Sequence, residues 1–131
     1  MSACRLQAGL QRLDRWLRPA ISTVGHECRH SVKFAKMHLG ELVLVGAPGE
    51  LITELGLRVK QEGARITGAR HVVVGGLADQ WISYILSDKE YRQGGYEASV
   101  SFYGPKLGET IVTGMLRGLG HLESSGETAS R

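Results

Sequence analysis

Two short apolar runs, each followed by glycines, constrain what this chain can fold into. The first covers residues 42–45 and leads into the turn Gly46–Gly49, and the second covers residues 71–74 and ends in Gly75-Gly76. Between them, apolar side chains recur at helical spacing at Leu51, Leu55 and Val59. The order of strand, turn, helix and strand predicts a βαβ unit, with parallel strands and a right-handed crossover.

The residues around this unit give further expectations. The uninterrupted apolar run at 42–45 predicts a strand buried on both faces, and we expect the helix to end near Gly63. Residues 37–39 form another short strand, joined to the first run by the turn Leu39-Gly40-Glu41. The pattern therefore predicts a β-hairpin ahead of the βαβ unit.

The second half of the chain alternates between short elements and turns. Residues 81–86 are interpreted as a strand or an extended loop. Ser87 is expected to cap a short helix through Arg92, with Glu90 completing a capping box, before Gly94-Gly95 ends it. Residues 97–103 alternate like a strand. A closing amphipathic helix is expected after Pro105, lined by Leu107, Ile111, Val112, Met115 and Leu116.

These elements predict an α/β fold with a βαβ unit, a mixed sheet and flanking helices. Three regions are expected: an N-terminal amphipathic helix and linker (1–25), the α/β domain (26–121) and a polar, disordered tail (122–131). The N-terminal stripe of leucines is flanked by arginines. It is interpreted as a surface helix, with an Arg-rich targeting or membrane-surface helix as the open alternative.

The composition of the 131 residues limits the partners and says little about location. The net charge is +3, but aromatic residues make up 6% and do not cluster with the basic ones, which argues against a nucleic-acid partner. No apolar run approaches the roughly 20 residues that cross a bilayer, and the N-terminus lacks the apolar core of a secretory signal. Cys4 and Cys28 form no CxxC and no disulfide framework. The compartment stays open.

The segment His26-Glu27-Cys28-Arg29-His30 matches the HExxH pattern of zinc peptidases. On a helix, that pattern puts both histidines on one face and the glutamate beside a zinc-bound water. Gly25 directly precedes the motif, and its neighbours keep no helical apolar stripe. We therefore expect a polar loop without bound metal here, and a zinc peptidase is the less favoured alternative.

Glu50, Tyr84 and Tyr96 are the candidate site residues. Taken singly, Glu50 is explained by the helix dipole, which favours a carboxylate in a first turn by a few tenths to about 1 kcal/mol. Tyr84 is explained as a half-buried strand residue, and Tyr96-Glu97 as the entry to a strand. In the βαβ unit, however, Glu50 follows the carboxyl end of a strand, where open α/β sheets place their sites. We predict that the three side chains converge on one concave surface.

Three segments together resemble one family. In order and spacing, the strand-PGE-helix segment, GLADQWISY and KEYRQGGYEASVSFYGP resemble the neutral/alkaline ceramidases, over roughly Val32 to Leu119. The resemblance implies the last part of a partial α/β catalytic domain. The family's reaction is zinc-dependent hydrolysis of an amide, which splits ceramide into sphingosine and fatty acid.

The resemblance also implies site residues. In that family, two histidines, a glutamate and a tyrosine hold the zinc, and a serine is implicated. By position, Glu50 and Tyr84 match the glutamate and the tyrosine that bind the metal, and Tyr96 matches the later tyrosine near the substrate amide. Zinc is then the cofactor, provided that the other ligands are supplied. Ceramide or another N-acyl lipid is the substrate, with contact to a membrane surface as a further possibility.

The chain departs from the family pattern in two places. Asp79 stands where an asparagine is usual, and a Thr-Thr pair after PGE is half kept as Ile52-Thr53. The histidine ligands and the serine are expected upstream of the matched segments. Three explanations stay open: a fragment that is inactive alone, a chain completed by a complementing chain or by self-association, and a non-catalytic binding or structural module of the same fold.

Overall fold

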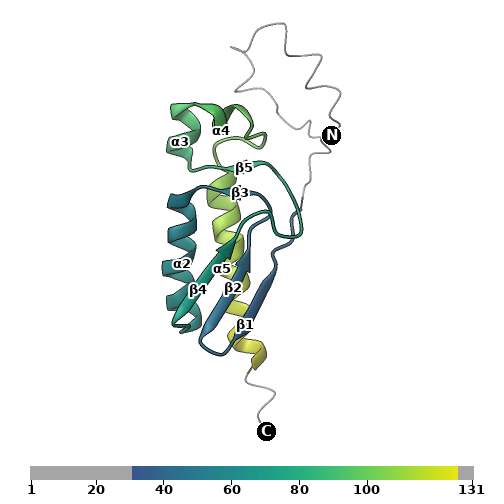
Figure 1. The fold of residues 1–131 in the computed structure, drawn as a ribbon, viewed down its shortest axis with the longest axis vertical. Helices are drawn as coiled ribbons and strands as arrows, with labels where there is room; N and C mark the ends of the chain where they lie inside the picture. The colour runs from purple at the N-terminus through teal and green to yellow at the C-terminus, as the bar shows by residue number, and fades with distance from the viewer. Residues whose placement is uncertain (1–30, 127–131) are drawn as a thin grey trace, which may run out of the picture.

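The computed structural model describes residues 31–126, and its centre is strand β2 (Leu42–Gly46). On one side β2 pairs antiparallel with β1 (Lys36–Leu39), and on the other it pairs parallel with β4 (His71–Gly75). The sheet order is therefore β1-β2-β4 (Figure 1). Gly40 has φ +59° in the turn between β1 and β2, a conformation that glycine adopts without steric cost. The predicted hairpin and the parallel strand pair are confirmed.

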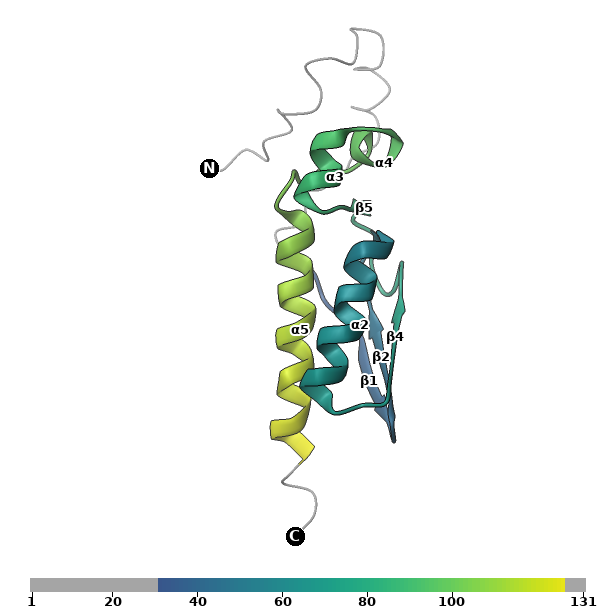
Figure 2. The ribbon, with the colours of Figure 1, turned by 90° about the vertical axis from the view of Figure 1, so that its left-hand side faces the viewer.

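Two long helices cover one face of this sheet. Helix α2 (Thr53–Thr67) is the crossover between β2 and β4, and α5 (Leu107–Gly126) lies beside it on the same face (Figure 2). The expected end of α2 near Gly63 is wrong. A Cβ at Gly63 would lie 3.0 Å from Leu119 Cδ1, so glycine stands there because α5 packs closely, and the helix ends at Gly68 with φ +62°.

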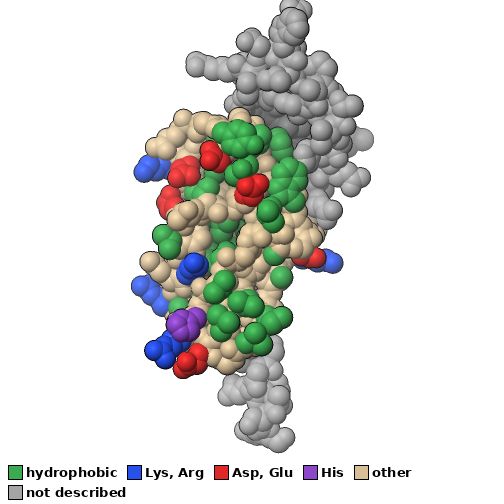
Figure 3. Space-filling model, in the orientation of Figure 1, with side chains coloured by type: hydrophobic (Ala, Val, Ile, Leu, Met, Phe, Trp, Pro, Cys, Tyr) green, Lys and Arg blue, Asp and Glu red, His purple; other side chains and the backbone are tan. Residues whose placement is uncertain are grey.

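The expectation that β2 is buried on both faces is also wrong. Val43 and Val45 are buried against the helices, but Leu44 is only half-buried on the other face. Its register partners Met37 and Val73 are 53% and 48% exposed. Figure 3 shows apolar side chains gathered on this open face. An apolar run such as 42–45 does not reveal how many faces are covered, because a strand with one covered face can carry apolar residues on both.

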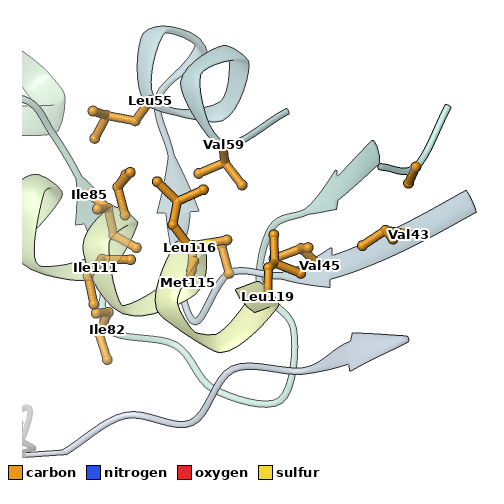
Figure 4. Packing of buried hydrophobic residues seen from close by; sticks show 13 residues of the cluster. Val43, Val45, Leu55, Val59, Ile82, Ile85, Ile111, Met115, Leu116 and Leu119 are labelled. Atoms are coloured by element: carbon orange, nitrogen blue, oxygen red, sulfur yellow. The ribbon is translucent and has the colours of Figure 1, made fainter. Parts of the chain in front are cut away.

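The core lies between the sheet and the two helices (Figure 4). Its buried members come from β2 and α2, from the residues just after each of them, from the segment around β5 and from α5: Val43, Val45, Ala47, Leu55, Val59, Ala69, Ile82, Ile85, Ile111, Val112, Met115, Leu116 and Leu119. The predicted amphipathic face of α5 is therefore confirmed. At the start of α5, Gly108 lets the helix backbone approach the carbonyl of Leu86, where a Cβ would clash.

A second, very small sheet lies beyond the carboxyl ends of β2 and β4. It consists of β3 (Glu50–Leu51) and β5 (Tyr84–Ile85), which are parallel. Leu51 therefore belongs to a strand, and the helix face that we expected it to share is formed by Leu55 and Val59. Residues 81–86, left open between strand and loop, contain this two-residue strand.

Two short helices follow β5. In α3 (Asp88–Gln93), the Ser87 side chain accepts a hydrogen bond from the Glu90 amide at 3.4 Å, which confirms the predicted N-cap. The strand expected over 97–103 is wrong, because α4 (Tyr96–Ser99) is helical and is followed by turns. Gly94 and Gly95, with φ +82° and +103°, turn the chain into α4, and the Ser99 amide bonds back to the Gly95 carbonyl at 3.1 Å.

Several expectations concern the ends of the chain. The N-terminal helix (1–25) and the His26–His30 motif lie outside the described residues. Helix α5 continues to Gly126, beyond the expected start of the polar tail at residue 122. In the described part of the chain, no helix has the length and apolar character to cross a membrane.

Candidate functional site

Glu50 and Tyr84 are register partners across the β3–β5 pair. The Glu50 amide donates a hydrogen bond to the Ser83 carbonyl at 3.0 Å, and the Ile52 amide donates one to the Ile85 carbonyl at 3.3 Å. Gly49 makes this approach possible, because a Cβ there would meet the Ser83 carbonyl oxygen closer than real Cβ atoms come. The Pro-Gly before Glu50 thus serves to bring two backbones together, and residues far apart in sequence become neighbours.

Glu50 lies in a strand and not in a first helical turn, since α2 begins at Thr53. The helix-dipole explanation for this glutamate therefore does not hold. Its side chain instead faces the Tyr84 hydroxyl, which donates a hydrogen bond to the Glu50 carboxylate.

That hydrogen bond, together with desolvation and the negative charge of Glu50, raises the pKa of Tyr84 to about 12. Smaller contributions come from Tyr96 and Glu97, which add negative charge when ionised. The phenol therefore stays protonated near neutral pH, with its proton directed at a carboxylate. The pair therefore consists of a protonated phenol beside a carboxylate.

Tyr96 completes the group. Its ring meets the ring of Tyr84 edge to face, with centroids 5.8 Å apart and planes at 78°, a favourable geometry for aromatic pairs. Tyr96 is the first residue of α4 and is 68% exposed, so a molecule from solvent can reach it. The structure thus brings Glu50, Tyr84 and Tyr96 together, and that these three surround a concave surface stays a prediction.

A separate hollow of about 550 Å³ lies elsewhere, between the segment before β1 and one side of α5. Its lining residues are Val32, Phe34, Glu109, Thr110, Ile111, Thr113, Gly114 and Arg117. None of the three candidate site residues lines it. The hollow is therefore not part of the candidate site, which lies beyond the carboxyl ends of β2 and β4.

The side chains of Glu50 and Tyr84 both offer oxygen atoms that could bind a zinc ion. A carboxylate is an ordinary zinc ligand, and a cation held by both oxygens would take the place of the proton between them. Among residues 31–126, no group of three or more His, Cys, Asp or Glu side chains could hold a metal. A catalytic zinc takes three protein ligands, so the described residues supply only part of such a site.

Sequence reasoning overlooked two buried serines beside these residues. Ser83 precedes Tyr84 and has φ +77°, and Ser101 donates a hydrogen bond to the Tyr84 carbonyl at 2.9 Å. The signal was available for Ser83, because it interrupts an otherwise apolar run. Nothing in the local pattern distinguishes Ser101 from an ordinary turn serine.

Comparison with known proteins identifies the family of the chain. A family model described as "Neutral/alkaline non-lysosomal ceramidase, N-terminal" matches residues 22–112. The chain belongs to this family. The resemblance stated from the sequence is therefore confirmed. That the chain corresponds to the last part of the catalytic domain stays a prediction.

The chain is 37% identical over 70 residues to the neutral ceramidase of Pseudomonas aeruginosa. The matched region covers 51% of this chain and 10% of that protein. The chain is 32% identical over 78 residues to neutral ceramidase 1 of Arabidopsis thaliana, covering 53% and 10%. The chain therefore spans about a tenth of the length of these relatives.

The crystal structure of the Pseudomonas aeruginosa neutral ceramidase matches with a TM-score of 0.66 and 27% identity, over 70% of this chain and 15% of that one. A ceramidase described as complexed with C2 matches with a TM-score of 0.67 at the same identity and coverage. The α/β fold class is confirmed. Asp79, where the resemblance led us to expect an asparagine, has φ +65°. Asn and Asp both adopt this conformation more readily than most residues, so the replacement keeps the backbone requirement.

Proposed function

We propose that this chain supplies part of the active site of a zinc-dependent amidohydrolase that cleaves N-acylsphingosines. Glu50 and Tyr84 would hold the metal, and Tyr96 would lie beside the scissile amide. The observation that carries the proposal is the pairing of the Glu50 carboxylate with the Tyr84 hydroxyl across two adjacent strands. Membership of the ceramidase family supports the same assignment.

Each residue has a role that follows from its chemistry. Glu50 contributes a negative oxygen donor, and its strand position fixes the direction of the carboxylate. Tyr84 contributes a phenol whose proton is held toward Glu50, so that its oxygen is oriented before any ligand arrives. Tyr96 is exposed and can donate its hydroxyl proton in a hydrogen bond to the oxygen that becomes negative during amide hydrolysis. Zinc bound at such a site polarises the amide carbonyl or activates a water.

The remaining ligands must come from residues other than 31–126 or from another chain, because the described residues hold no complete metal group. We therefore expect the isolated chain to hydrolyse no ceramide even when zinc is added. We expect no residual hydrolysis, since residues that act together in one site do not contribute independently.

A graft tests the proposal directly. Residues 32–119 of this chain replace the matched segment of the Pseudomonas aeruginosa neutral ceramidase, to which the chain is 37% identical. We expect the chimera to contain zinc and hydrolyse ceramide. Glu50→Gln in the graft should abolish both zinc content and activity, and Tyr96→Phe should lower kcat by about 100- to 1000-fold with zinc retained, as for loss of one oxyanion donor.

The matched control is Glu41→Gln. Glu41 is an exposed carboxylate in the turn before β2, 3.9 Å from Arg70, at the end of the sheet opposite Glu50. This change should leave both readouts unaltered. A folded chimera without ceramide hydrolysis, or one whose hydrolysis survives Glu50→Gln, would contradict the proposal. Turnover by the isolated chain would show that the site is completed within these 131 residues.

A further inference from the structure

Two buried serines join the segments that carry Tyr84 and Tyr96. Ser83, which is 1% exposed, donates a side-chain hydrogen bond to the Val100 carbonyl. Ser101, which is 5% exposed, donates one to the Tyr84 carbonyl at 2.9 Å. The two bonds run in opposite directions between the same pair of segments. We call this pair of hydrogen bonds the serine clasp.

The clasp also includes the strand that carries Glu50. The Ser83 carbonyl accepts the hydrogen bond of the Glu50 amide at 3.0 Å, while its hydroxyl reaches Val100. Ser83 has φ +77°, which is uncommon for a residue with a side chain. Such a conformation persists where the surroundings impose it, and it recurs at functional sites. Ser83 is therefore linked to Glu50, to Tyr84 and to the segment after α4.

Helix α4 packs against α3, so a link to the strand that presents Tyr84 is a separate constraint on it. It is four residues long, and none of its residues is buried. Ser99 donates a hydrogen bond to the Tyr96 carbonyl at 2.6 Å, but this bond lies within α4 and reaches no other element. The clasp ties the chain at residues 100–101, directly after α4, to the strand that presents Tyr84.

We propose that Ser83 and Ser101 are positioning residues that hold the Tyr96 ring against the Tyr84 ring. They act through the backbone carbonyls of Val100 and Tyr84, so their hydroxyls need not touch a substrate. The importance of this placement for catalysis rests on the proposed function. The placement itself can be measured in the metal-free protein.

The test is nuclear Overhauser contact between the two rings in the full chain, labelled at tyrosine and free of zinc. Centroids 5.8 Å apart should give cross-peaks between the Tyr84 and Tyr96 rings. Ser101→Ala should abolish these cross-peaks while the contacts between β2 and β4 persist. Ser101→Thr, which keeps a hydroxyl, should retain them. Ser99→Ala is the matched control, because it removes a serine hydroxyl from the same region without cutting the clasp.

Contacts between the rings that persist in either folded variant, Ser83→Ala or Ser101→Ala, would overturn the proposal. If a variant does not fold, a second measurement can be made on the unaltered chain. The Ser101 hydroxyl proton should exchange slowly with water, because it is buried and bonded to the Tyr84 carbonyl. Rapid exchange of that proton would refute the clasp. Since both measurements are made without zinc, they are independent of the graft experiment.

Discussion

Gly49→Ala is expected to separate the two strands that carry the candidate metal ligands. The new Cβ would come within 3.0 Å of the Ser83 carbonyl oxygen and lie 3.1 Å from Ile85 Cδ1. Ordinary contacts of this kind are 3.4–4 Å, so β3 and β5 must move apart by roughly half an ångström or more. The hydrogen bond from the Glu50 amide to the Ser83 carbonyl, now 3.0 Å, would then reach the length at which it is lost.

The expected cost follows from the bonds that hold this pair of strands. Loss of the bonds from the Glu50 and Ile52 amides costs about 1 kcal/mol each, and residual overpacking adds about 1 kcal/mol. Alanine also restricts the unfolded chain relative to glycine, which offsets about 0.5 kcal/mol. The net loss of unfolding free energy is about 2–3 kcal/mol, which lowers Tm by about 10–20 °C in a domain of this size.

Urea unfolding followed by circular dichroism measures this loss, with Gly56→Ala as the matched control. Gly56 lies inside α2, and a Cβ there meets nothing within 4 Å. The same substitution should therefore stabilise the protein by about 0.5–1 kcal/mol, since alanine favours a helix. If Gly49→Ala is as stable as the unaltered chain, the close approach of β3 and β5 is not what requires glycine, and the account of the Pro-Gly-Glu turn fails.

Four further outcomes are expected. Glu50→Gln should lower the pKa of Tyr84 from about 12 toward 10, because it removes the charged acceptor of the phenol; absorbance at alkaline pH, with Tyr84→Phe to assign the signal, measures this. The raised pKa of Tyr84 favours the fold below about pH 10, and this contribution is lost as pH rises through about 12. Met115→Ala should cost about 2–5 kcal/mol of unfolding free energy because Met115 is buried in the core, whereas Leu57→Ala, at a 51% exposed position, should cost under about 0.5 kcal/mol. Ser87→Ala should lower the unfolding free energy by about 0.5–2 kcal/mol through loss of the α3 cap. Urea titration measures the unfolding free energy of these three variants.

Much of the sheet and its helices could be predicted from local pattern. The hairpin at Gly40, the βαβ order and the Ser87 cap each depend on residues close together in sequence, where periodicity and turn chemistry are direct signals. The errors arose where contacts between residues far apart in sequence determine the structure. Gly63 looked like a helix end because glycine often ends helices. Its actual role is to let Leu119 of α5 pack closely, and no local pattern shows that contact.

The candidate site also combines features that the sequence reveals with features that depend on distant contacts. Glu50, Tyr84 and Tyr96 were selected through the family resemblance, and the β3–β5 register explains why Glu50 meets Tyr84. Residues 97–103 alternate like a strand, yet Gly94 and Gly95 turn the chain into α4, and the Ser101 hydroxyl ties the segment after α4 to the Tyr84 carbonyl. Alternation shows only which residues are apolar, whereas the hydrogen bond of Ser101 depends on where β5 lies.

The register between β3 and β5 bears on how such a site can change over evolution. The contact between Glu50 and Tyr84 is set by two pairs of strand residues, so the loops between them can gain or lose residues without moving either side chain. An insertion of one residue inside β3 or β5 is different, because it turns the side chain to the opposite face. Distant relatives should therefore keep the dipeptides on each strand while the number of residues between them drifts. A search that fixes that number would miss such proteins.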